Sequence, residues 1–362
     1  MLIVDAHEDL AYNILTYGRD YTISAAETRR RERGTQTPQQ NGDTLLGWPE
    51  YQQGQVAIVF STLFAVPARR REGPSETQVY STPDQAHQLY RAQIDVYHRL
   101  ADEHADKFRL IRTQNDLQEV LSHWEDSQAE THPVGLTILM EGAEGVRSAD
   151  ELEEWWNLGL RLIGPAWAGT RFCGGTREPG PLTEEGYALL EGMADLGFVL
   201  DLSHMDQESA LQALDTYPDT IVASHANAQA LLKGLDSNRH LPNRVIQGIL
   251  ERSGVIGIVP VNAFLFAGWK KGEARDLVSL DHIVAQIDYV CQMAGDARHV
   301  GLGTDFDGGF GVQSVPAGID TIVDLQKLVP LLANKGYTQE DVAAILGSNW
   351  INLLQQCLPE NI

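Results

Sequence analysis

Several histidines and carboxylates in this sequence follow directly after short apolar segments, where a fold could gather their side chains into one site. The chain begins with MLIVDAHEDL, in which His7 and Asp9 stand two positions apart at the end of an apolar segment. Because side chains at positions i and i+2 of an extended strand point to the same face, this pair can hold one object together. Four further residues share this position at the end of an apolar segment: Glu141, His204, His225 and Asp305.

Three imidazoles and three carboxylates gathered in this way need positive charge between them. Each partly buried ionised group loses much of its hydration, and divalent cations would offset that loss. Imidazole nitrogen and carboxylate oxygen are also common zinc ligands, and two ions bridged by one carboxylate fit such a set better than a single ion. One histidine at a strand end is more often structural, and Glu141 alone could be an ordinary loop acid. The coincidence of the whole set favours a metal site.

The order of elements along the chain predicts a fold that brings these ends together. Eight short apolar segments are typical of strands: 2–7, 55–66, 134–141, 160–167, 197–204, 220–225, 254–261 and 299–308. Amphipathic segments that predict helices lie between them, at 83–104, 183–197, 207–217 and 281–295. This alternation predicts an α/β fold, a (β/α)8 TIM-type barrel, with an open doubly wound sheet as the alternative. In a barrel, the carboxyl ends of all strands meet on the face that carries chemistry.

No linker or low-complexity tract divides the chain, so we expect one domain over residues 1–362. Residues 18–50 are polar, Arg-rich and weakly periodic, which predicts a long loop or lid after the first strand. The segment 338–356 predicts a closing helix with Thr338 as its N-cap and an acidic first turn.

Composition argues against several classes of partner. The 50 acidic and 27 basic residues give a net charge of −23, which would repel nucleic acid and an anionic membrane. Two basic clusters, at 29–33 and 69–72, are best explained as solvated loop charge. No segment approaches the roughly 18 apolar residues of a membrane span, and three widely spaced cysteines argue against a disulfide framework. We therefore expect a cytoplasmic protein that acts on a small molecule.

Six motifs, in order along nearly the whole chain, resemble those of the membrane dipeptidase family (renal dipeptidase, peptidase family M19), a branch of the metal-dependent amidohydrolase superfamily. They are DAHEDL, LMEGAEG, DLSHMD, ASHANA, SNRHLPN and GLGTDFDG. The resemblance implies a site with two Zn²⁺ ions, and other divalent transition metals such as cobalt and manganese suit the same ligands. It implies that His7 and Asp9 hold one ion, that His204 and His225 hold the other, and that Glu141 bridges them.

The same resemblance implies roles in substrate binding and proton transfer. Arg239 would receive the α-carboxylate of a dipeptide, a task suited to its forked guanidinium. Asp305 and the bridging Glu141 would be the catalytic carboxylates, and Asp305 would carry the proton from the attacking water to the departing amine. The implied activity is the hydrolysis of dipeptides, with a D-residue accepted at the C-terminal position. The implied assembly is a homodimer.

One position departs clearly from the family pattern. Trp167 stands where the family has a histidine, after the fourth strand, that contacts the substrate carbonyl. An indole offers one N–H donor and no charge, and losing one such contact often costs about 2.7–4 kcal/mol. Either a neighbour such as Arg171 compensates, or the substrate differs, for instance an N-acyl amino acid or a cyclic amide. A third alternative is a barrel that holds metals and a small ligand without catalysis. His240, in place of the family's asparagine, is a milder departure.

Overall fold

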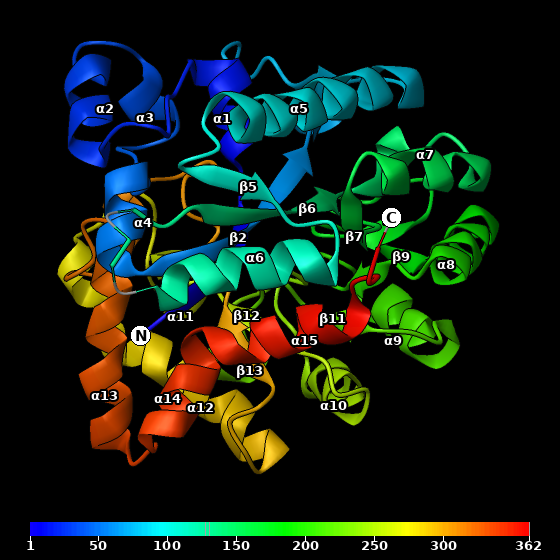
Figure 1. The fold of residues 1–362 in the computed structure, drawn as a ribbon. Coiled ribbons are helices and arrows are strands. Elements are labelled where there is room, and N and C mark those ends of the chain that lie inside the picture. The colour runs from blue at the N-terminus through cyan, green and yellow to red at the C-terminus, as the bar shows by residue number, and fades with distance from the viewer. Residues whose placement is uncertain (127, 130, 362) are drawn as a thin grey trace.

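Eight parallel strands form a nearly closed barrel at the centre of the computed structural model, which describes residues 1–126, 128, 129 and 131–361 (Figure 1). The barrel strands are β1 (Ile3–Glu8), β2 (Val56–Phe64), β6 (Val134–Glu141), β7 (Leu160–Gly164), β10 (Val199–Asp201), β11 (Ile221–Val222), β12 (Ile256–Ile258) and β13 (Val300–Leu302). Their order in the sheet is β11-β10-β7-β6-β2-β1-β13-β12, and an isolated bridge between Ala223 and Ile256 joins the two ends. The predicted (β/α)8 barrel is confirmed, and the open doubly wound sheet is excluded.

Several barrel strands end earlier than the apolar segments of the sequence predict. β10, β11 and β13 end at Asp201, Val222 and Leu302, whereas the predicted strands continue to 204, 225 and 308. At two of these ends the backbone leaves the sheet through a left-handed residue, with φ of 66° at His204 and 58° at Asp305. Because a strand requires negative φ, these polar residues lie on turns just past the strands rather than within them.

Short strands in the loops add small ribbons that the sequence did not predict: β3 (Val66–Pro67), β4 (Val79–Tyr80), β5 (Phe108–Leu110), β8 (Cys173–Gly175) and β9 (Glu178–Leu182). β3 pairs with β4, β8 pairs with β9, and β5 runs parallel to the first residues of β6. Segments of two to five residues, several with Gly or Pro, carry too little periodicity to be recognised in a sequence.

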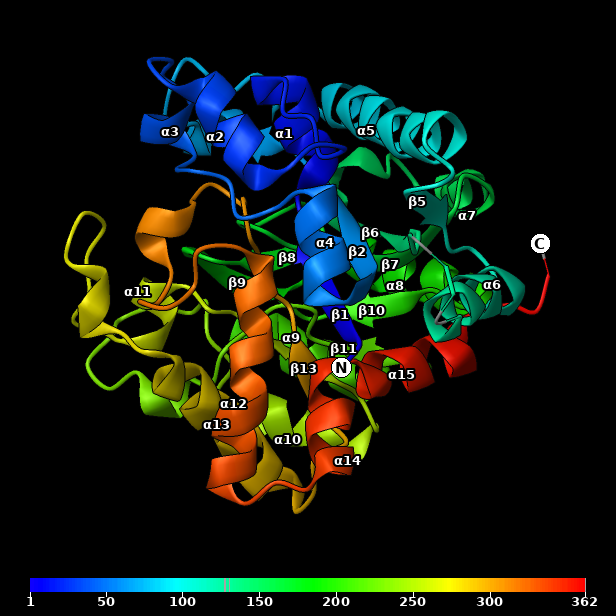
Figure 2. The same ribbon diagram turned by 60° about the vertical axis from the view of Figure 1, so that its left-hand side comes forward.

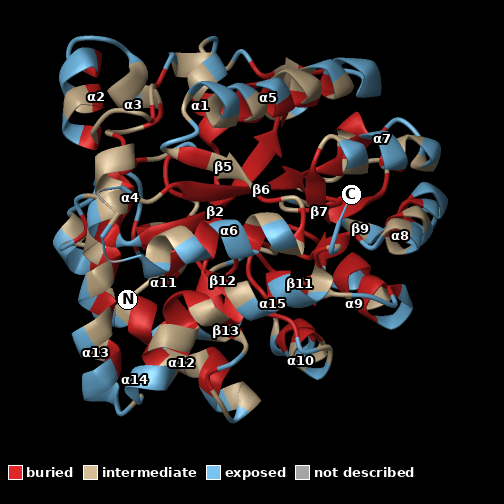
Figure 3. Cartoon of the chain, viewed as in Figure 1, coloured by how far each residue is buried: buried red, intermediate tan, exposed pale blue. Residues whose placement is uncertain are grey.

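Helices cover the outside of the barrel, and the longer ones bury one face (Figure 3). Those that match predicted segments within one residue are α5 (Pro83–Glu103), α8 (Glu184–Leu196), α9 (Gln207–Thr216) and α12 (Leu280–Ala294). Thr82 and Thr183 cap α5 and α8 by accepting from the backbone N–H groups of Gln85 and Gly186. Further helices are α1 (Leu10–Tyr17), α6 (Gln114–Glu125), α7 (Leu152–Asn157), α10 (Asn243–Glu251), α11 (Asn262–Leu265) and α13 (Leu328–Lys335).

Single turns of 3₁₀ helix connect many of these elements: Ala68–Arg70, Ala143–Gly145, Ala149–Glu151, Gln229–Leu231, Arg275–Leu277 and Val312–Ser314. A longer 3₁₀ segment, Ile322–Lys327, leads into α13. Among the helices that the structure describes, none combines the length and the apolarity that crossing a bilayer requires.

The segment 18–50, predicted as a polar loop or lid, contains helices: α2 (Ala25–Glu32), α3 (Thr37–Gln40) and the start of α4 (Trp48–Gly54). α2 begins where the Ser24 hydroxyl accepts from the backbone N–H of Glu27, whose carboxylate pairs with Arg30 and Arg31 one turn later. The first basic cluster therefore lies on a helix, because these pairs support a helix without an apolar stripe. α2 and α3 lie beside α1 in both views (Figures 1 and 2).

The segment 338–356, predicted as one closing helix, is helical throughout: α14 (Gln339–Ala343), a π-helical turn (Ala344–Ser348) and α15 (Asn349–Cys357). As predicted, Thr338 is the N-cap, and its hydroxyl accepts from the backbone N–H of Asp341 at 3.1 Å. The indole N–H of Trp350 donates to the carbonyl of Leu302 at 3.1 Å. A Cβ at Gly301 would lie 2.2 Å from that nitrogen, so glycine lets this helix pack closely against β13.

Candidate metal centre

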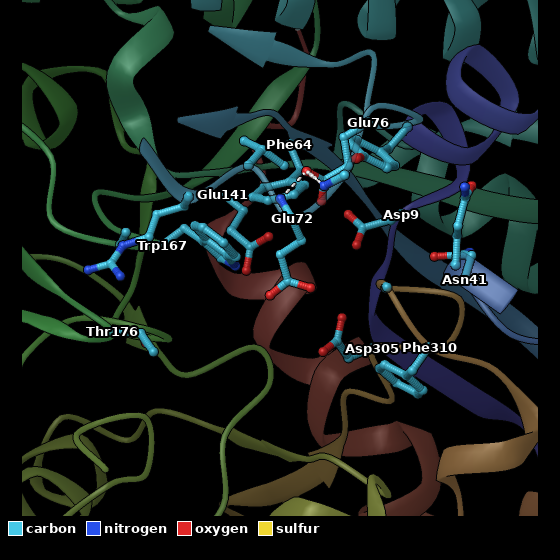
Figure 4. A pocket seen from close by; sticks show the side chains of 18 of the residues that line it. Asp9, Asn41, Phe64, Glu72, Glu76, Glu141, Trp167, Thr176, Asp305 and Phe310 are labelled. Carbon is cyan, nitrogen blue, oxygen red and sulfur yellow. Dashed lines mark hydrogen bonds between the residues drawn. The ribbon is translucent and has the colours of Figure 1, made fainter. Parts of the chain in front are cut away.

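The five predicted ligand residues and Asp305, the predicted proton carrier, come together at the carboxyl end of the barrel. His7 lies in β1, Asp9 follows β1 directly, and Glu141 is the last residue of β6. The other three occupy the third position after β10, β11 and β13: His204, His225 and Asp305. Ligand atoms lie within 4.8 Å of one another in three overlapping groups: His7, Asp9 and Glu141; Glu141, His204 and His225; and His7, His225 and Asp305. The groups border a pocket of about 520 Å³, into which Asp9, Glu141 and Asp305 point (Figure 4).

Glu141 and two histidines form the tightest of these groups. The Oε1 atom of Glu141 lies 3.0 Å from Nε2 of His204 and 3.2 Å from Nε2 of His225. The two Nε2 atoms are 3.0 Å apart. Ligand atoms placed about 2.0–2.1 Å from a tetrahedral zinc ion are about 3.4 Å from one another. The triangle of three ligand atoms is therefore close to the size of one face of a zinc tetrahedron.

The outer ring nitrogens of both histidines are held by hydroxyl groups. Nδ1 of His225 lies 2.9 Å from the Ser224 hydroxyl, which donates to Oδ2 of Asp201 at 2.5 Å. Since that hydroxyl proton is used on Asp201, the hydroxyl accepts the Nδ1 proton of His225. Nδ1 of His204 lies 2.9 Å from the hydroxyl of Thr176. A proton on Nδ1 leaves the Nε2 lone pair free, which is the form in which imidazole binds a metal.

His7 supplies the second group and has the environment of an unsatisfied ligand. Its ring is fully buried, and neither ring nitrogen has a hydrogen-bond partner among the described residues. Nε2 lies 3.7 Å from Oε2 of Glu141 and 3.8 Å from Oδ1 of Asp305, distances that are too long for hydrogen bonds but suited to an ion between the atoms. Asp9, on the same side, accepts a hydrogen bond from the Thr62 hydroxyl. A buried imidazole without a partner is costly, and a cation would satisfy it.

Burial works against charge on these carboxylates. Burial, and then the neighbouring charges of Asp9 and Asp305, raise the pKa of Glu141 well above its usual range. Burial raises the pKa of Asp9 to about 6. Burial also lowers the pKa values of His204 and His225 well below the usual range, which favours neutral imidazoles. Divalent cations would supply the missing positive charge, and the residues present therefore fit metal ions.

Two buried aspartates clamp the turns that carry the ligands. Asp201 accepts from the backbone N–H groups of Ser203 at 2.9 Å and Ser224 at 2.8 Å, which joins the turns after β10 and β11. Asp5 accepts from the backbone N–H and the hydroxyl of Thr304, at 2.7 and 2.5 Å, which joins β1 to the turn after β13. The sequence analysis missed both. The available signal was an aspartate two or three residues before a predicted histidine ligand.

Arg239 lies in the same pocket with much of its hydrogen-bonding capacity unused. The residue is 4% exposed, and its guanidinium packs 5.5 Å from the centre of the Phe264 ring. One terminal nitrogen donates to the carbonyl of His225 at 2.8 Å. Its Nε and other terminal nitrogen have no acceptor among the residues that the structure describes. A buried guanidinium with unpaired N–H groups is suited to a carboxylate from outside the protein.

Asp305 is placed by the glycine-rich turn that carries it. Its backbone N–H donates to the carbonyl of His7 at 3.1 Å, which ties this turn to the first strand. A Cβ at Gly308 would lie 2.1 Å from Oδ1 of Asp305, so the glycine leaves room for the carboxylate. Burial, and then the charge of Asp9, raise the pKa of Asp305 well above its usual range. A carboxyl group that readily holds a proton is suited to proton transfer.

Trp167 lines the pocket, but Arg171, the residue expected to compensate for it, does not. The indole lies 5.1 Å from the ring of Phe64 and 6.3 Å from that of His204, measured between ring centres. Arg171 instead donates to Glu144 at 3.0 Å and to Glu185 at 2.9 Å, and it is not among the lining residues. Arg171 therefore does not compensate for the missing histidine.

His240 lies beside Arg239 and borders a second, smaller pocket instead of the first. The residue is 4% exposed, and its ring packs edge-on against Phe264 with 5.1 Å between the ring centres. This departure from the family's asparagine thus lies behind the guanidinium and outside the site.

Asp307, which the sequence analysis also missed, anchors the segment 18–50 to the turn after β13. It forms a buried ion pair with Arg19 at 2.9 Å and accepts from the Tyr21 hydroxyl at 2.9 Å. The Thr44 hydroxyl and the backbone N–H of Leu45 complete its hydrogen bonds. These partners lie more than 260 residues away in the chain, so no local pattern could reveal them.

The chain is similar to known proteins over nearly its whole length. A family model described as membrane dipeptidase (peptidase family M19) matches residues 1–358. A crystal structure of a metallopeptidase from Rhodobacter sphaeroides, liganded with a phosphinate mimic of the dipeptide L-Ala-D-Ala, is 25% identical, with a TM-score of 0.76 and 99% of both chains covered. A crystal structure of a metallopeptidase described as dipeptidase AC is 26% identical, with the same TM-score and coverage. A Claviceps purpurea protein named dipeptidase tcpJ is 24% identical over 273 residues, which are 73% of this chain and 59% of that protein.

Proposed function

Because the chain belongs to the membrane dipeptidase family, peptidase family M19, as its motifs predicted, we propose that it hydrolyses dipeptides with the help of two divalent metal ions. The observation that carries the proposal is the shared pocket. Glu141 belongs to two of the candidate ligand groups, and Arg239, with its unpaired guanidinium N–H groups, lies in the same cavity. A metal centre beside an anion-binding arginine is the arrangement that a peptide with a free C-terminal carboxylate requires.

Five residues would hold the metals. His7 and Asp9 would bind one ion, His204 and His225 the other, and Glu141 would bridge them, in keeping with the first two ligand groups. Zinc suits this mixture of nitrogen and oxygen ligands, and other divalent transition metals suit it as well. When bound, the ions would supply an acidified water and a polarised carbonyl at neutral pH.

The protein's own side chains would select and orient the substrate. Arg239 would bind the C-terminal carboxylate with its unpaired N–H groups, which leaves room for one residue on that side of the scissile bond and favours dipeptides. Asp305 would accept a proton from the attacking water on its carboxylate and return it to the departing amine. Acceptance of a D-residue at the C-terminal position is part of the same proposal, and the mimic of L-Ala-D-Ala bound by the Rhodobacter relative supports it.

Metal analysis followed by a dipeptide assay tests this function. The purified protein should contain divalent transition metal, or take it up, and should release free amino acids from L-Ala-D-Ala or L-Ala-L-Ala. A chelator should abolish the release, and added metal should restore it. Asp305→Asn should fold, keep its metal and lose activity. A metal-loaded protein that cleaves no member of a broad dipeptide panel would overturn the proposal.

A second candidate function follows from Trp167, which lines the pocket where the family has a histidine. An indole cannot supply a cationic hydrogen bond to the developing oxyanion, and loss of one such group often slows catalysis about a hundred- to thousandfold. The substrate would then be an N-acyl amino acid or a cyclic amide. Acyl amino acids hydrolysed faster than dipeptides would favour this candidate. A large gain in dipeptide hydrolysis on Trp167→His would show that this position limits peptidase chemistry.

The proposal includes a cytoplasmic location and a homodimer. The unpaired cysteines, Cys173, Cys291 and Cys357, suit a reducing compartment. Light scattering coupled to gel filtration would test the assembly, and a monomer at assay concentrations would contradict it.

A further inference from the structure

Aromatic side chains form a wall along one part of the catalytic pocket. Tyr12 on α1, Phe64 at the end of β2 and Trp167 after β7 all line it. The rings of Tyr12 and Phe64 are 5.6 Å apart between centres, and those of Phe64 and Trp167 are 5.1 Å apart. Such a wall can accommodate the apolar stem of a long side chain and attracts a positive charge at its end.

Glu72 extends into the pocket from the loop between β3 and β4 (Figure 4). Among the described residues, its carboxylate has no ion-pair partner and no hydrogen bond, although its backbone N–H donates to Glu76 at 2.7 Å. The carboxylate of Glu76 also lies 3.4 Å from the backbone N–H of Gly73, so Glu76 holds the loop while Glu72 faces the cavity. An exposed carboxylate in a substrate pocket attracts a cationic group.

The arginines that precede Glu72 are engaged elsewhere. Arg69 and Arg70 both pair with Glu178 on β9, at 2.8 and 2.7 Å. Arg71 donates to the carbonyls of Gly73 and Pro74 within its own loop. The basic cluster at 69–72, predicted as solvated loop charge, therefore leaves the negative charge of Glu72 available to a ligand.

The order of strands places this wall away from the arginine that would bind the substrate carboxylate. Tyr12 follows β1 and Phe64 ends β2, whereas Arg239 follows β11, the sixth barrel strand, which lies across the barrel from them. Trp167, which follows β7, lies between these two sides. Three further cationic residues line the pocket: Arg177, whose backbone N–H donates to Asn238 next to Arg239, Lys271, in the loop after α11, and Arg70, which is paired with Glu178. A dipeptide held by its carboxylate at Arg239 would therefore extend its N-terminal residue toward the wall and Glu72.

We infer that the pocket selects dipeptides whose N-terminal residue carries a basic side chain, with the stem of that side chain on the aromatic wall and its cationic end at Glu72. This inference rests on the proposed dipeptidase function and narrows its substrate class. Glu72 is here a specificity-determining residue and takes no part in bond cleavage. The net charge of −23 acts in the same direction, because it raises the local concentration of cationic substrates.

Paired substrates test the inference on the metal-loaded enzyme. L-Lys-D-Ala and L-norleucyl-D-Ala share an unbranched stem and differ in the terminal ammonium group. We expect kcat/KM to be about two- to fivefold higher for the lysyl dipeptide, as for an exposed charge pair. The ratio should fall toward one as ionic strength rises. Glu72→Gln should lower it to near one, and Glu72→Lys should invert it. Glu153→Gln, at an exposed position on α7, is the matched control and should keep the wild-type ratio.

Two measurements that do not depend on turnover complete the test. Calorimetric titration of the metal-free protein, which leaves the dipeptide intact, should show tighter binding of L-Lys-D-Ala than of L-norleucyl-D-Ala, and Glu72→Gln should remove the difference. The metal content of Glu72→Gln should equal that of the wild type. A lower content would mean that Glu72 is a metal ligand and would overturn the inference.

The outcomes separate this inference from the function on which it rests. If the enzyme cleaves L-Ala-D-Ala, but wild type and Glu72→Gln have equal ratios of kcat/KM for L-Lys-D-Ala over L-norleucyl-D-Ala, the dipeptidase function stands and the preference for a basic side chain is refuted. If the metal-loaded enzyme cleaves none of these dipeptides, both the dipeptidase function and the preference for a basic side chain are refuted.

Discussion

Replacement of Ser224 by alanine should weaken metal binding, although Ser224 is not itself a candidate metal ligand. The Ser224 hydroxyl lies between Oδ2 of Asp201, at 2.5 Å, and Nδ1 of His225, at 2.9 Å, and so fixes which ring nitrogen of the histidine carries the proton. Without it, the imidazole can rotate or place its proton on Nε2, the atom that faces Glu141 at 3.2 Å. Loss of a partner of this kind lowers metal affinity about 10- to 100-fold, or about 1.4–2.7 kcal/mol.

The variant should also lose some stability. Asp201 keeps the backbone N–H groups of Ser203 and Ser224 but loses a hydroxyl donor, which costs about 1–3 kcal/mol for a buried acceptor. Ser209→Ala is a matched control, because Ser209 is fully buried and its hydroxyl donates to the carbonyls of Gly174 and Asp206 rather than to a ligand residue.

The assay is a titration of metal-free protein with Zn²⁺ in competition with a chromophoric chelator. Ser224→Ala should release zinc at a chelator concentration about 10- to 100-fold lower than the wild type requires, which is the effect expected for loss of a hydrogen-bond partner of a metal ligand. Ser209→Ala should match the wild type in zinc affinity while losing comparable stability in urea. Equal zinc affinities for Ser224→Ala and the wild type would refute the proposed role of the Asp201–Ser224–His225 chain.

Three further predictions follow from other parts of the fold. Asp307→Asn should lower the free energy of unfolding by about 1–3 kcal/mol, because the buried guanidinium of Arg19 loses one of its two carboxylate partners and keeps the other, Glu32; Asp320→Asn, which breaks the exposed pair with Arg29, should cost under about 1 kcal/mol in the same urea titration. Arg239→Lys should keep the charge but lose the fork, and kcat/KM for L-Ala-D-Ala should fall about thirtyfold, mainly through KM; an unchanged KM would remove Arg239 from carboxylate binding. Burial raises the pKa values of the three thiols, to about 12 for Cys173, 11 for Cys291 and 12 for Cys357, so iodoacetamide at pH 8 should modify the native protein far more slowly than the unfolded chain. Mass spectrometry that finds equal rates would contradict the burial of these thiols.

The barrel could be predicted because its evidence is repeated along the chain. Eight apolar segments alternate with amphipathic ones, and the barrel strands lie within those segments, except that β1 extends one residue further, to Glu8. The carboxyl ends were predicted too long at His204 and Asp305, because a left-handed residue in a polar turn leaves no apolar gap in the pattern. The segment 18–50 was predicted as a loop because α2 is stabilised by ion pairs, which hydrophobic periodicity does not reveal.

The site was only partly visible in the sequence. Residue type and position at the end of a strand were enough to select the six candidates, which the structure gathers into three overlapping groups with ligand atoms within 4.8 Å of one another. The supporting residues were missed because their partners are distant in the chain: Asp5 binds Thr304, and Asp307 binds Arg19. Glu72 was missed for a different reason. Its role depends on the neighbouring arginines being paired with other groups, such as Glu178, and the motif RRRE taken alone indicates a basic surface.

The first strand of the chain is the last to find both neighbours. β1 pairs with β2 on one side and, through Asp5 and Leu302, with β13 on the other. During synthesis, the growing polypeptide must therefore keep an apolar strand with one open edge for nearly 300 residues, until β13 emerges. His7 lies on this strand, so its place opposite Asp305 is fixed only when β13 pairs with β1. We therefore expect metal binding that uses His7 to follow closure of the barrel.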